Sequence, residues 1–322
     1  MRLNLSWVVA ALTLAGAAQA QTKWDLPAAY ASSNFHTENL VQFAADVDKA
    51  SAGKLKITVH ANASLFKAPE IKRAVQAGQA QIGEILLVNY QNEWQIFGID
   101  GLPFLASSYD DSRKLYKAQR PVLEKKLAEQ GLMLLYAVAW PPQGIFSKTP
   151  INSVADLKGI KWRAYSPATS RIAELLGAQP VTVQAAELPQ AMAAGVIESY
   201  MSSGSTGYDS RTYEHLKYFT DTQAWLPKNA VLVNKAAFDA LDKPTQAALL
   251  KAAADAEARG WVVSRVRNTE SIDLLKKSGM TVVGPSLQLR SDLQQVGDTM
   301  LQEWLQKAGP EGQSVVDTYR KL

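Results

Sequence analysis

The stretch KLKITVH, residues 54–60, alternates polar and apolar side chains, which is the pattern of a strand with one buried face. A helical pattern precedes it at 38–50, and a second follows at 68–76 with Pro69 in its first turn. Strand-length apolar runs at 22–29 and 82–88 flank this unit. The order β-α-β-α-β predicts a parallel sheet with right-handed crossovers, and therefore an α/β fold.

The same order of elements recurs in the second part of the chain. An apolar strand is expected at 131–140, and the Pro-Pro pair at 141–142 ends it. A short helix that contains Asp156 and Leu157 is then expected, ended by Gly159, followed by helices at 167–176 and 185–194. Strands at 160–164, 179–183 and 198–202 alternate with them. Two α/β units in series indicate two lobes.

A long helical run follows the two units. It begins at Pro244 and extends to Lys277, so it should measure roughly 45–50 Å at 1.5 Å per residue, with Gly260 as an interruption. Its apolar positions do not keep a heptad, which argues against a coiled coil and favours a strut across both lobes. A short strand at 281–283 and an amphipathic helix at 287–308 are expected after it.

The composition excludes several classes of protein. The 322 residues contain no cysteine, which excludes disulfides, thiolate metal sites and cysteine nucleophiles. Basic residues exceed acidic ones by only 34 to 30, too small an excess for a nucleic-acid surface. His36, His60 and His215 lack metal-site spacing, and no Gly-rich nucleotide-binding motif occurs. We therefore expect no metal and no cofactor.

The first twenty residues differ from the rest of the chain. Arg2 is their only charge, residues 7–14 are mostly apolar, and Ala-Gln-Ala at 18–20 is typical of a signal-peptidase site. This pattern predicts a secretory signal peptide at 1–20 and a mature periplasmic protein beginning near Gln21. No later apolar run reaches the length of a membrane span, so we expect a soluble mature chain, and a monomer.

A strand runs directly into a helix start in IKWRAYSP, residues 160–167. Ligands of open α/β sheets bind beyond the carboxyl ends of the strands, and Arg163 lies at such an end. Its guanidinium can make two parallel hydrogen bonds to a carboxylate, and the following helix N-terminus adds positive potential. Arg163 is therefore the candidate carboxylate-binding residue, with a surface ion pair as the alternative.

Further candidate ligand-binding residues lie at strand ends and loops, where a cleft between two lobes is expected. The aromatic candidates are Phe35, Tyr90, Trp140, Tyr165, Tyr208 and Trp225, of which we expect two to four to touch ligand; core packing is the alternative for each. His36 and Ser203, the latter in the Gly- and Ser-rich loop at 203–207, are included. Glu84 is a charge in an apolar strand, and it either accepts a hydrogen bond from a ligand hydroxyl or pairs with a basic neighbour.

Several segments resemble the substrate-binding proteins of TRAP transporters, the DctP family. They are VQAGQAQIG at 75–83, SKTPI at 147–151, ADLKGIKWR at 155–163 and WLPKNAVLVN at 225–234, and the resemblance covers nearly the whole mature chain. It implies an α/β, two-lobed, type II-like periplasmic-binding-protein fold, with a long helix spanning both lobes and Arg163 holding the ligand carboxylate. The lobes expected are residues 21–141 plus about 228–265, and 142–227 plus about 266–322, with the ligand cleft between them.

Two positions depart from the best-known members of that family. Gln143 stands where the sialic-acid binders have a second Arg, and Ser202 stands where they have Asn. With one Arg, less charge is available for a second carboxylate, which argues against sialic acid and C4-dicarboxylates. One Arg among aromatic, hydroxyl and amide groups favours a monocarboxylate, such as a hydroxy or keto acid, with an apolar or aromatic body.

These expectations combine into a periplasmic protein that binds an organic acid and delivers it to a TRAP-type membrane permease, without catalysing a reaction. The permease is implied by the resemblance alone. A binding protein that serves a sensor has the same fold and site, so it stays open as an alternative. A secreted serine hydrolase is the other alternative, with Ser205 and His215 as its only candidate nucleophile and base.

Overall fold

Three β-sheets organise the described part of the chain. The computed structural model describes residues 21–322, so the expected signal peptide lies outside the described residues. A parallel pair joins β1 (Thr22–Pro27) and β2 (Leu55–His60). A three-stranded sheet has the order β3-β10-β4, formed by Ile82–Leu86, Lys228–Asn234 and Leu132–Ala139. A six-stranded sheet has the order β11-β9-β5-β8-β6-β7, formed by Thr281–Val283, Tyr218–Thr220, Gln143–Ser147, Ser199–Ser203, Lys161–Ala164 and Gln179–Thr182.

The first β-α-β unit forms as the alternating pattern predicts. α1 (Phe35–Ala50) connects β1 to β2, and Trp24 of β1 lies opposite Ile57 of β2 in register. α1 begins three residues earlier than expected because Asn34 caps it, its side chain accepting a hydrogen bond from the backbone N–H of His36. The sequence pattern between residues 22 and 60 thus predicts these two strands and the helix between them correctly.

The expectation of one parallel sheet in this region is wrong at its third strand. β3 pairs antiparallel with β10, and β10 also pairs antiparallel with β4 on its other side. β10 lies far along the chain from both partners, and its side chains are almost all buried. Local periodicity predicts that a segment is a strand, but it carries no information about a partner so distant in sequence.

The six-stranded sheet is mixed. β6 pairs parallel with both β7 and β8, whereas β5 runs antiparallel between β8 and β9. β5 starts at Gln143, directly after the two prolines that end the preceding strand segment. Tyr165, which directly follows β6, donates a hydrogen bond to Gln143 at the start of β5, so the carboxyl end of β6 lies near the point where the chain enters this sheet.

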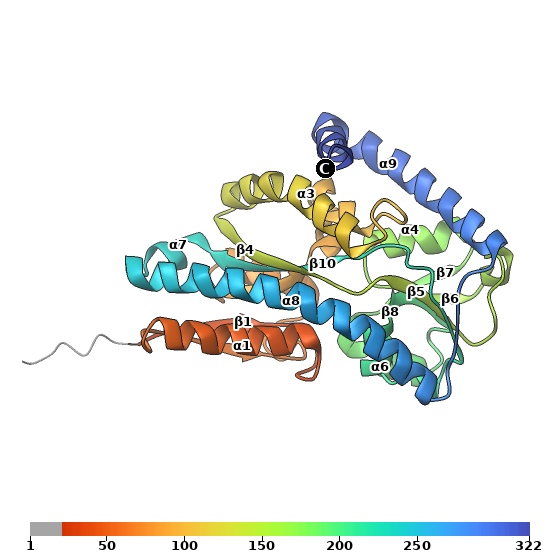
Figure 1. Ribbon diagram of the computed structural model, residues 1–322, viewed down its shortest axis with the longest axis horizontal. Coiled ribbons are helices and arrows are strands. Elements are labelled where there is room, and N and C mark those ends of the chain that lie inside the picture. Colours follow the sequence, from red (N-terminus) through yellow and green to blue (C-terminus); the bar gives the residue numbers. More distant parts are fainter. Residues whose placement is uncertain (1–20) are drawn as a thin grey trace, which may run out of the picture.

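The helices cover these sheets and connect them (Figure 1). They are α2 (Ile71–Gln76), α3 (Tyr109–Glu129), α4 (Pro167–Leu175), α5 (Leu188–Ala193), α6 (Gly204–Asp209), α7 (Lys235–Asp239), α8 (Lys243–Lys277) and α9 (Leu287–Arg320), with short 3-10 turns at 68–70, 87–90, 95–101, 154–157, 185–187 and 212–214. α9 is longer than the expected 287–308, because the helix resumes after a kink at Gly309, whose φ is 61°.

The strut predicted from the long helical run is confirmed in α8. Its 35 residues span about 52 Å, and it packs on α1 and β4 at one end and on α6 and β11 at the other (Figure 1). Gly260 does not interrupt the helix: a Cβ there would collide with the side chain of Val138 on β4, so glycine allows the close approach.

Two short backbone crossings connect the sheets beside this strut. They run side by side, since Trp140 N–H donates to Pro227 O at 2.8 Å and Gln143 N–H donates to Trp225 O at 3.0 Å. The three-stranded sheet draws on residues 82–139 and 228–234, and the six-stranded sheet on 143–220 and 281–283. The lobe boundaries at 141/142 and 227/228 stay a prediction.

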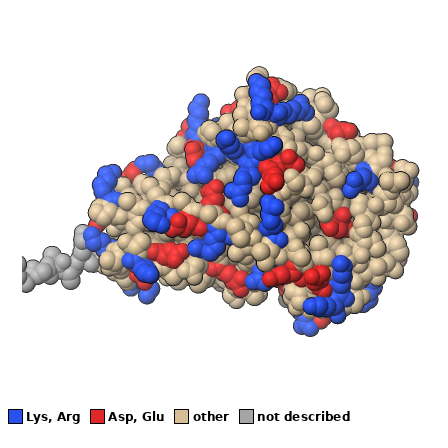
Figure 2. Space-filling view, viewed as in Figure 1, with Lys and Arg blue, Asp and Glu red and all other residues tan. Residues whose placement is uncertain are grey.

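The surface shows mixed charge. Lys and Arg are interspersed with Asp and Glu over the face seen in Figure 2, as the small net charge of +4 would suggest. Within residues 21–322, none of the helices combines the length and the apolar character that crossing a bilayer requires.

Candidate ligand-binding site

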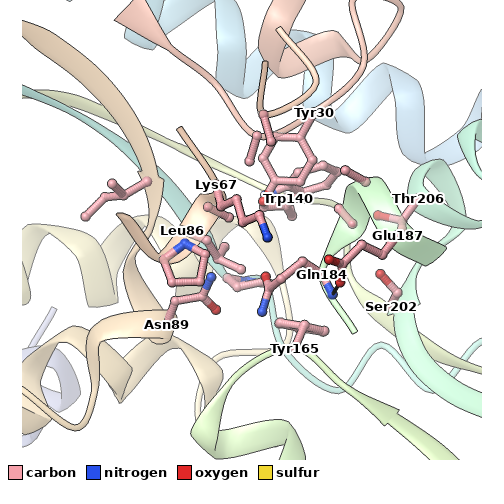
Figure 3. Close-up of a pocket in the computed structure, with 18 of the residues that line it drawn as sticks. Tyr30, Lys67, Leu86, Asn89, Trp140, Tyr165, Gln184, Glu187, Ser202 and Thr206 are labelled. Atoms are coloured by element: carbon pink, nitrogen blue, oxygen red, sulfur yellow. Dashed lines mark hydrogen bonds between the residues drawn. The ribbon is translucent and has the colours of Figure 1, made fainter. Parts of the chain in front are cut away.

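A cavity lies between the three-stranded and six-stranded sheets, at the ends of strands from both. Its lining residues are Ala29, Tyr30, Ala63, Lys67, Ala68, Pro69, Glu84, Ile85, Leu86, Asn89, Trp140, Gln143, Arg163, Tyr165, Gln184, Ala185, Ala186, Glu187, Ser202, Thr206 and Pro227. In the view of Figure 3, Tyr30 and Tyr165 lie on opposite sides, with Asn89 and Ser202 on the other two. The ammonium of Lys67 points toward the centre of this view.

Arg163 places a buried positive charge in the cavity wall. Arg163 is 3% exposed, and its Nε donates to Val183 O at 2.9 Å. Its guanidinium lies over the rings of Tyr165 and Tyr200. No carboxylate of residues 21–322 lies within 4 Å of it, and burial lowers its pKa below the usual range. A buried cation without an internal counter-ion is suited to receive an anion from outside.

Glu84 places a buried carboxylate on the other side of the cavity, on β3. It is 3% exposed, and its Oε1 lies 3.5 Å from His36 Nδ1. Its Oε2 has no hydrogen-bond partner among the described residues. Glu84 and Arg163 do not pair with each other, so the cavity offers one buried anionic and one buried cationic group to a ligand, whereas the lining residues Lys67 and Glu187 are exposed.

Trp140 and Tyr30 form the aromatic wall between these charges. Trp140 Nε1 donates to Asn229 Oδ1 at 2.9 Å, and its ring packs edge-on against Tyr30 at 4.8 Å between centroids. Burial and the charge of Glu84 raise the pKa of Tyr30, so its hydroxyl stays protonated at neutral pH. The wall is apolar apart from the Tyr30 hydroxyl, which donates to Asn229 Oδ1 at 3.5 Å.

Gln143 and Tyr165 provide neutral polar groups near the cation. Gln143 Nε2 donates to Pro141 O at 2.8 Å, and its Oε1 accepts from the Tyr165 hydroxyl at 3.4 Å. Burial raises the pKa of Tyr165, which keeps its hydroxyl a neutral donor. The amide at position 143 is thus engaged within the protein and adds no second positive charge.

The structure brings six of the candidate residues to the cavity and places the other six behind it. Those that line it are Glu84, Trp140, Gln143, Arg163, Tyr165 and Ser202, and those that do not are Phe35, His36, Tyr90, Ser203, Tyr208 and Trp225. Phe35 and His36 pack behind Trp140, and Ser203 caps α6. The Tyr90 hydroxyl donates to Ala68 O, Tyr208 packs on Tyr213, and Trp225 is fully buried.

Several lining residues were not among the candidates, notably Tyr30, Lys67, Asn89, Gln184 and Thr206. Three of them follow the carboxyl ends of strands: Tyr30 follows β1, Asn89 follows β3, and Gln184 follows β7. The strand-end rule that selected Arg163 applies equally to them. Thr206 also follows a strand, β8, and lies in the Gly- and Ser-rich loop at 203–207. Lys67 carries no such signal, because it lies seven residues after β2, directly before the 3-10 turn at 68–70.

The histidines and the Ser205–His215 pair considered in the sequence can be located in the structure. Among residues 21–322, no group of three or more His, Asp or Glu side chains is arranged to hold a metal ion. Ser205 and His215 form no hydrogen bond with each other in the part of the chain that the structure describes.

A family model and several solved structures match this chain, and all of them describe solute-binding proteins or solute receptors. Residues 28–307 match the family model of bacterial extracellular solute-binding protein, family 7, DctP. The crystal structure of DctP6, a Bordetella pertussis extracytoplasmic solute receptor binding pyroglutamic acid, is 65% identical, with a TM-score of 0.93 over 94% of this chain and 100% of that chain.

Two further solved structures are similar over almost the same length. DctP7, a second Bordetella pertussis receptor binding pyroglutamic acid, is 46% identical with a TM-score of 0.92, over 93% of this chain and 99% of that chain. A TRAP solute binding protein from a marine metagenome, specific for pyroglutamate and complexed with it, is 44% identical with a TM-score of 0.92, over 94% of this chain and 99% of that chain.

Proposed function

The chain belongs to family 7 of the bacterial extracellular solute-binding proteins, the DctP family of TRAP receptors, and from this premise we propose its ligand and role. The ligand is a small cyclic lactam carboxylate of the pyroglutamate type. The protein captures it in the periplasm and delivers it to a TRAP-type membrane permease. It acts by binding, as the receptors of its family do.

One observation carries the choice of ligand: the cavity holds two buried, opposite charges that do not pair with each other. Arg163 has no carboxylate within 4 Å in residues 21–322, and Glu84 Oε2 has no hydrogen-bond partner there. A ligand with a carboxylate at one point and an N–H donor at another satisfies both groups. Pyroglutamate has both on one five-membered ring.

The remaining lining fits the rest of such a ring. Its methylene groups would lie against Trp140 and Tyr30, which bury apolar surface without competing for its polar atoms. Asn89, Ser202 and Thr206 supply neutral polar groups for the lactam carbonyl. This narrows the hydroxy or keto acid expected from the sequence to an acid with a ring N–H donor.

The three similar structures support this proposal independently of the cavity. Each is a receptor named for pyroglutamic acid or pyroglutamate, at 44% to 65% identity and nearly full coverage of both chains. A role in transport is favoured over service to a sensor, since the marine relative is a TRAP solute binding protein.

A binding titration tests the proposal. The protein, expressed from the 322-residue sequence and purified from the periplasm, is unfolded and refolded to remove bound ligand, then titrated calorimetrically with pyroglutamate, proline and succinate. We expect saturable 1:1 binding of pyroglutamate and a midpoint of thermal unfolding that rises with its concentration. Binding of succinate without any response to pyroglutamate would overturn the proposed ligand.

A further inference from the structure

His36 and Glu84 form a buried pair at the β3 side of the cavity. Their side chains are 1% and 4% exposed, and His36 Nδ1 lies 3.5 Å from Glu84 Oε1. His36 supplies the only basic group within 4 Å of this carboxylate in residues 21–322. A carboxylate so deeply buried is stable in its charged form only when nearby donors compensate for lost water.

The ring of His36 is held in one place. It packs against both Phe35 and Trp140, with centroid distances of 4.1 Å and 4.3 Å. Its backbone N–H donates to the Asn34 side chain at 3.0 Å, in the first turn of α1. The ring therefore has little freedom to turn away from Glu84, although it does not itself line the cavity.

The other ionisable groups around Glu84 are uncharged donors. The negative charge of Glu84 contributes, after burial, to raising the pKa of Tyr30 and of Tyr136. Neither hydroxyl forms a hydrogen bond with Glu84. Arg163 influences Tyr30 as well, but does not pair with Glu84.

We propose that His36 is a positioning residue that sets ligand specificity through Glu84. The Nδ1 of its imidazole faces Oε1 at 3.5 Å and holds the carboxylate in place as a donor, and this leaves Oε2 to accept a hydrogen bond from the ring N–H of the ligand. His36 thus acts without touching the ligand. The inference rests on the proposed function, and it concerns why a lactam is chosen over similar rings.

This arrangement predicts discrimination against an isosteric lactone. In 5-oxotetrahydrofuran-2-carboxylate a ring oxygen replaces the N–H of pyroglutamate, so two acceptors would face each other at Glu84. Leaving a buried charged acceptor unpaired, with a repulsive partner, should weaken binding roughly 100-fold relative to the lactam.

Two substitutions at His36 test its role with the same two probes. His36→Phe keeps an aromatic ring but removes the donor, and we expect the lactam preference to fall below about 10-fold, mostly through weaker lactam binding. His36→Asn places an amide N–H near the former Nδ1, and it should restore most of the preference. A purely structural role would weaken both ligands to the same extent, and that result would overturn the proposal.

Glu84→Gln gives a second test that does not depend on the folding of the His36 variants. Its amide N–H can donate to the ring oxygen, so the lactone should bind as well as or better than the lactam. An unchanged lactam preference in this variant would overturn the proposal. Tight lactam binding without lactone discrimination in the unmodified protein contradicts only this inference, whereas no lactam binding contradicts the proposed function as well.

Discussion

Lys228 and Arg163 are both buried cations, and they differ in where the opposite charge comes from. Lys228 is fully buried on β10, where its Nζ lies 3.4 Å from Asp100 Oδ2 and its backbone N–H donates to the same oxygen at 2.8 Å. Arg163 is equally enclosed at the end of β6, yet no carboxylate of residues 21–322 lies within 4 Å. One charge is matched within the fold, and the other faces a cavity.

The difference separates a structural charge from a binding charge. Burial lowers the pKa of both cations, and it raises the pKa of Asp100, while the attraction between Asp100 and Lys228 opposes the shifts in that pair. At Arg163 the desolvation cost remains in the empty protein. A ligand carboxylate would supply the missing compensation, so binding energy concentrates there.

The strongest way to break this comparison is to remove the internal partner of Lys228. Asp100→Asn should destabilise the protein by about 3–5 kcal/mol, because the lysine is left buried without its counter-charge. Urea unfolding of the unliganded protein measures this loss. The double variant Asp100→Asn, Lys228→Met is the control and should recover most of the stability; a single variant as stable as the double would contradict a structural role for the pair.

Arg163→Ala should affect ligand binding strongly and the stability of the unliganded protein little, the opposite of Asp100→Asn. We expect unchanged or slightly higher stability of the unliganded protein, since a buried charge without a partner is lost, and at least about 100-fold weaker ligand binding. Calorimetric titration and thermal unfolding of the same preparation separate these effects. Arg163→Lys keeps the charge but not the planar fork, so it should restore only part of the affinity. Retained affinity in Arg163→Ala would remove this residue from the site.

A smaller effect is expected at Asp209, which accepts a hydrogen bond from Asn34 Nδ2 at 2.7 Å between the ends of α6 and α1. Desolvation of the carboxyl group raises its pKa to about 6, although the residue as a whole is exposed. The folded state therefore holds this proton more tightly than the unfolded state between about pH 4 and 6. Its contribution to stability is greatest below that window and declines as the pH rises through it.

The measurement is thermal unfolding as a function of pH. The midpoint of Asp209→Asn should decline less from pH 4.5 to 6.5 than that of the unmodified protein. The corresponding difference between the two proteins in the free energy of unfolding should stay below about 1 kcal/mol, because solvent screens a charge on an exposed residue. Parallel pH profiles for the two proteins would show that this carboxyl group does not hold its proton as inferred.

Most helices and strands were predictable because their signals are local. The alternation at 54–60, the glycine after α1 and the unbroken helical run of α8 each indicate their element without reference to distant residues. The antiparallel insertion of β10 was not predictable in this way. Its register against β3 and β4 depends on contacts between segments far apart in the chain.

The candidate site divides in a similar manner. Arg163 was identifiable because a strand that runs into a helix start places its last residues at a sheet edge. Tyr90, Tyr208 and Trp225 carried the same type of signal, yet they lie outside the cavity lining. Aromatic side chains suit cores and clefts equally, so only the packing of neighbours determines which surface they join.

The sequence by itself determined the α/β elements, the long helical strut and the presence of a single well-placed arginine, because these follow from periodicity and residue chemistry. Only the tertiary structure decided which buried charges find partners within the chain. Lys228 meets Asp100 and Glu84 meets His36, while Arg163 meets no carboxylate within 4 Å in the described residues. Ion pairing acts over a few ångströms, and such distances between remote residues exist only once the chain has folded.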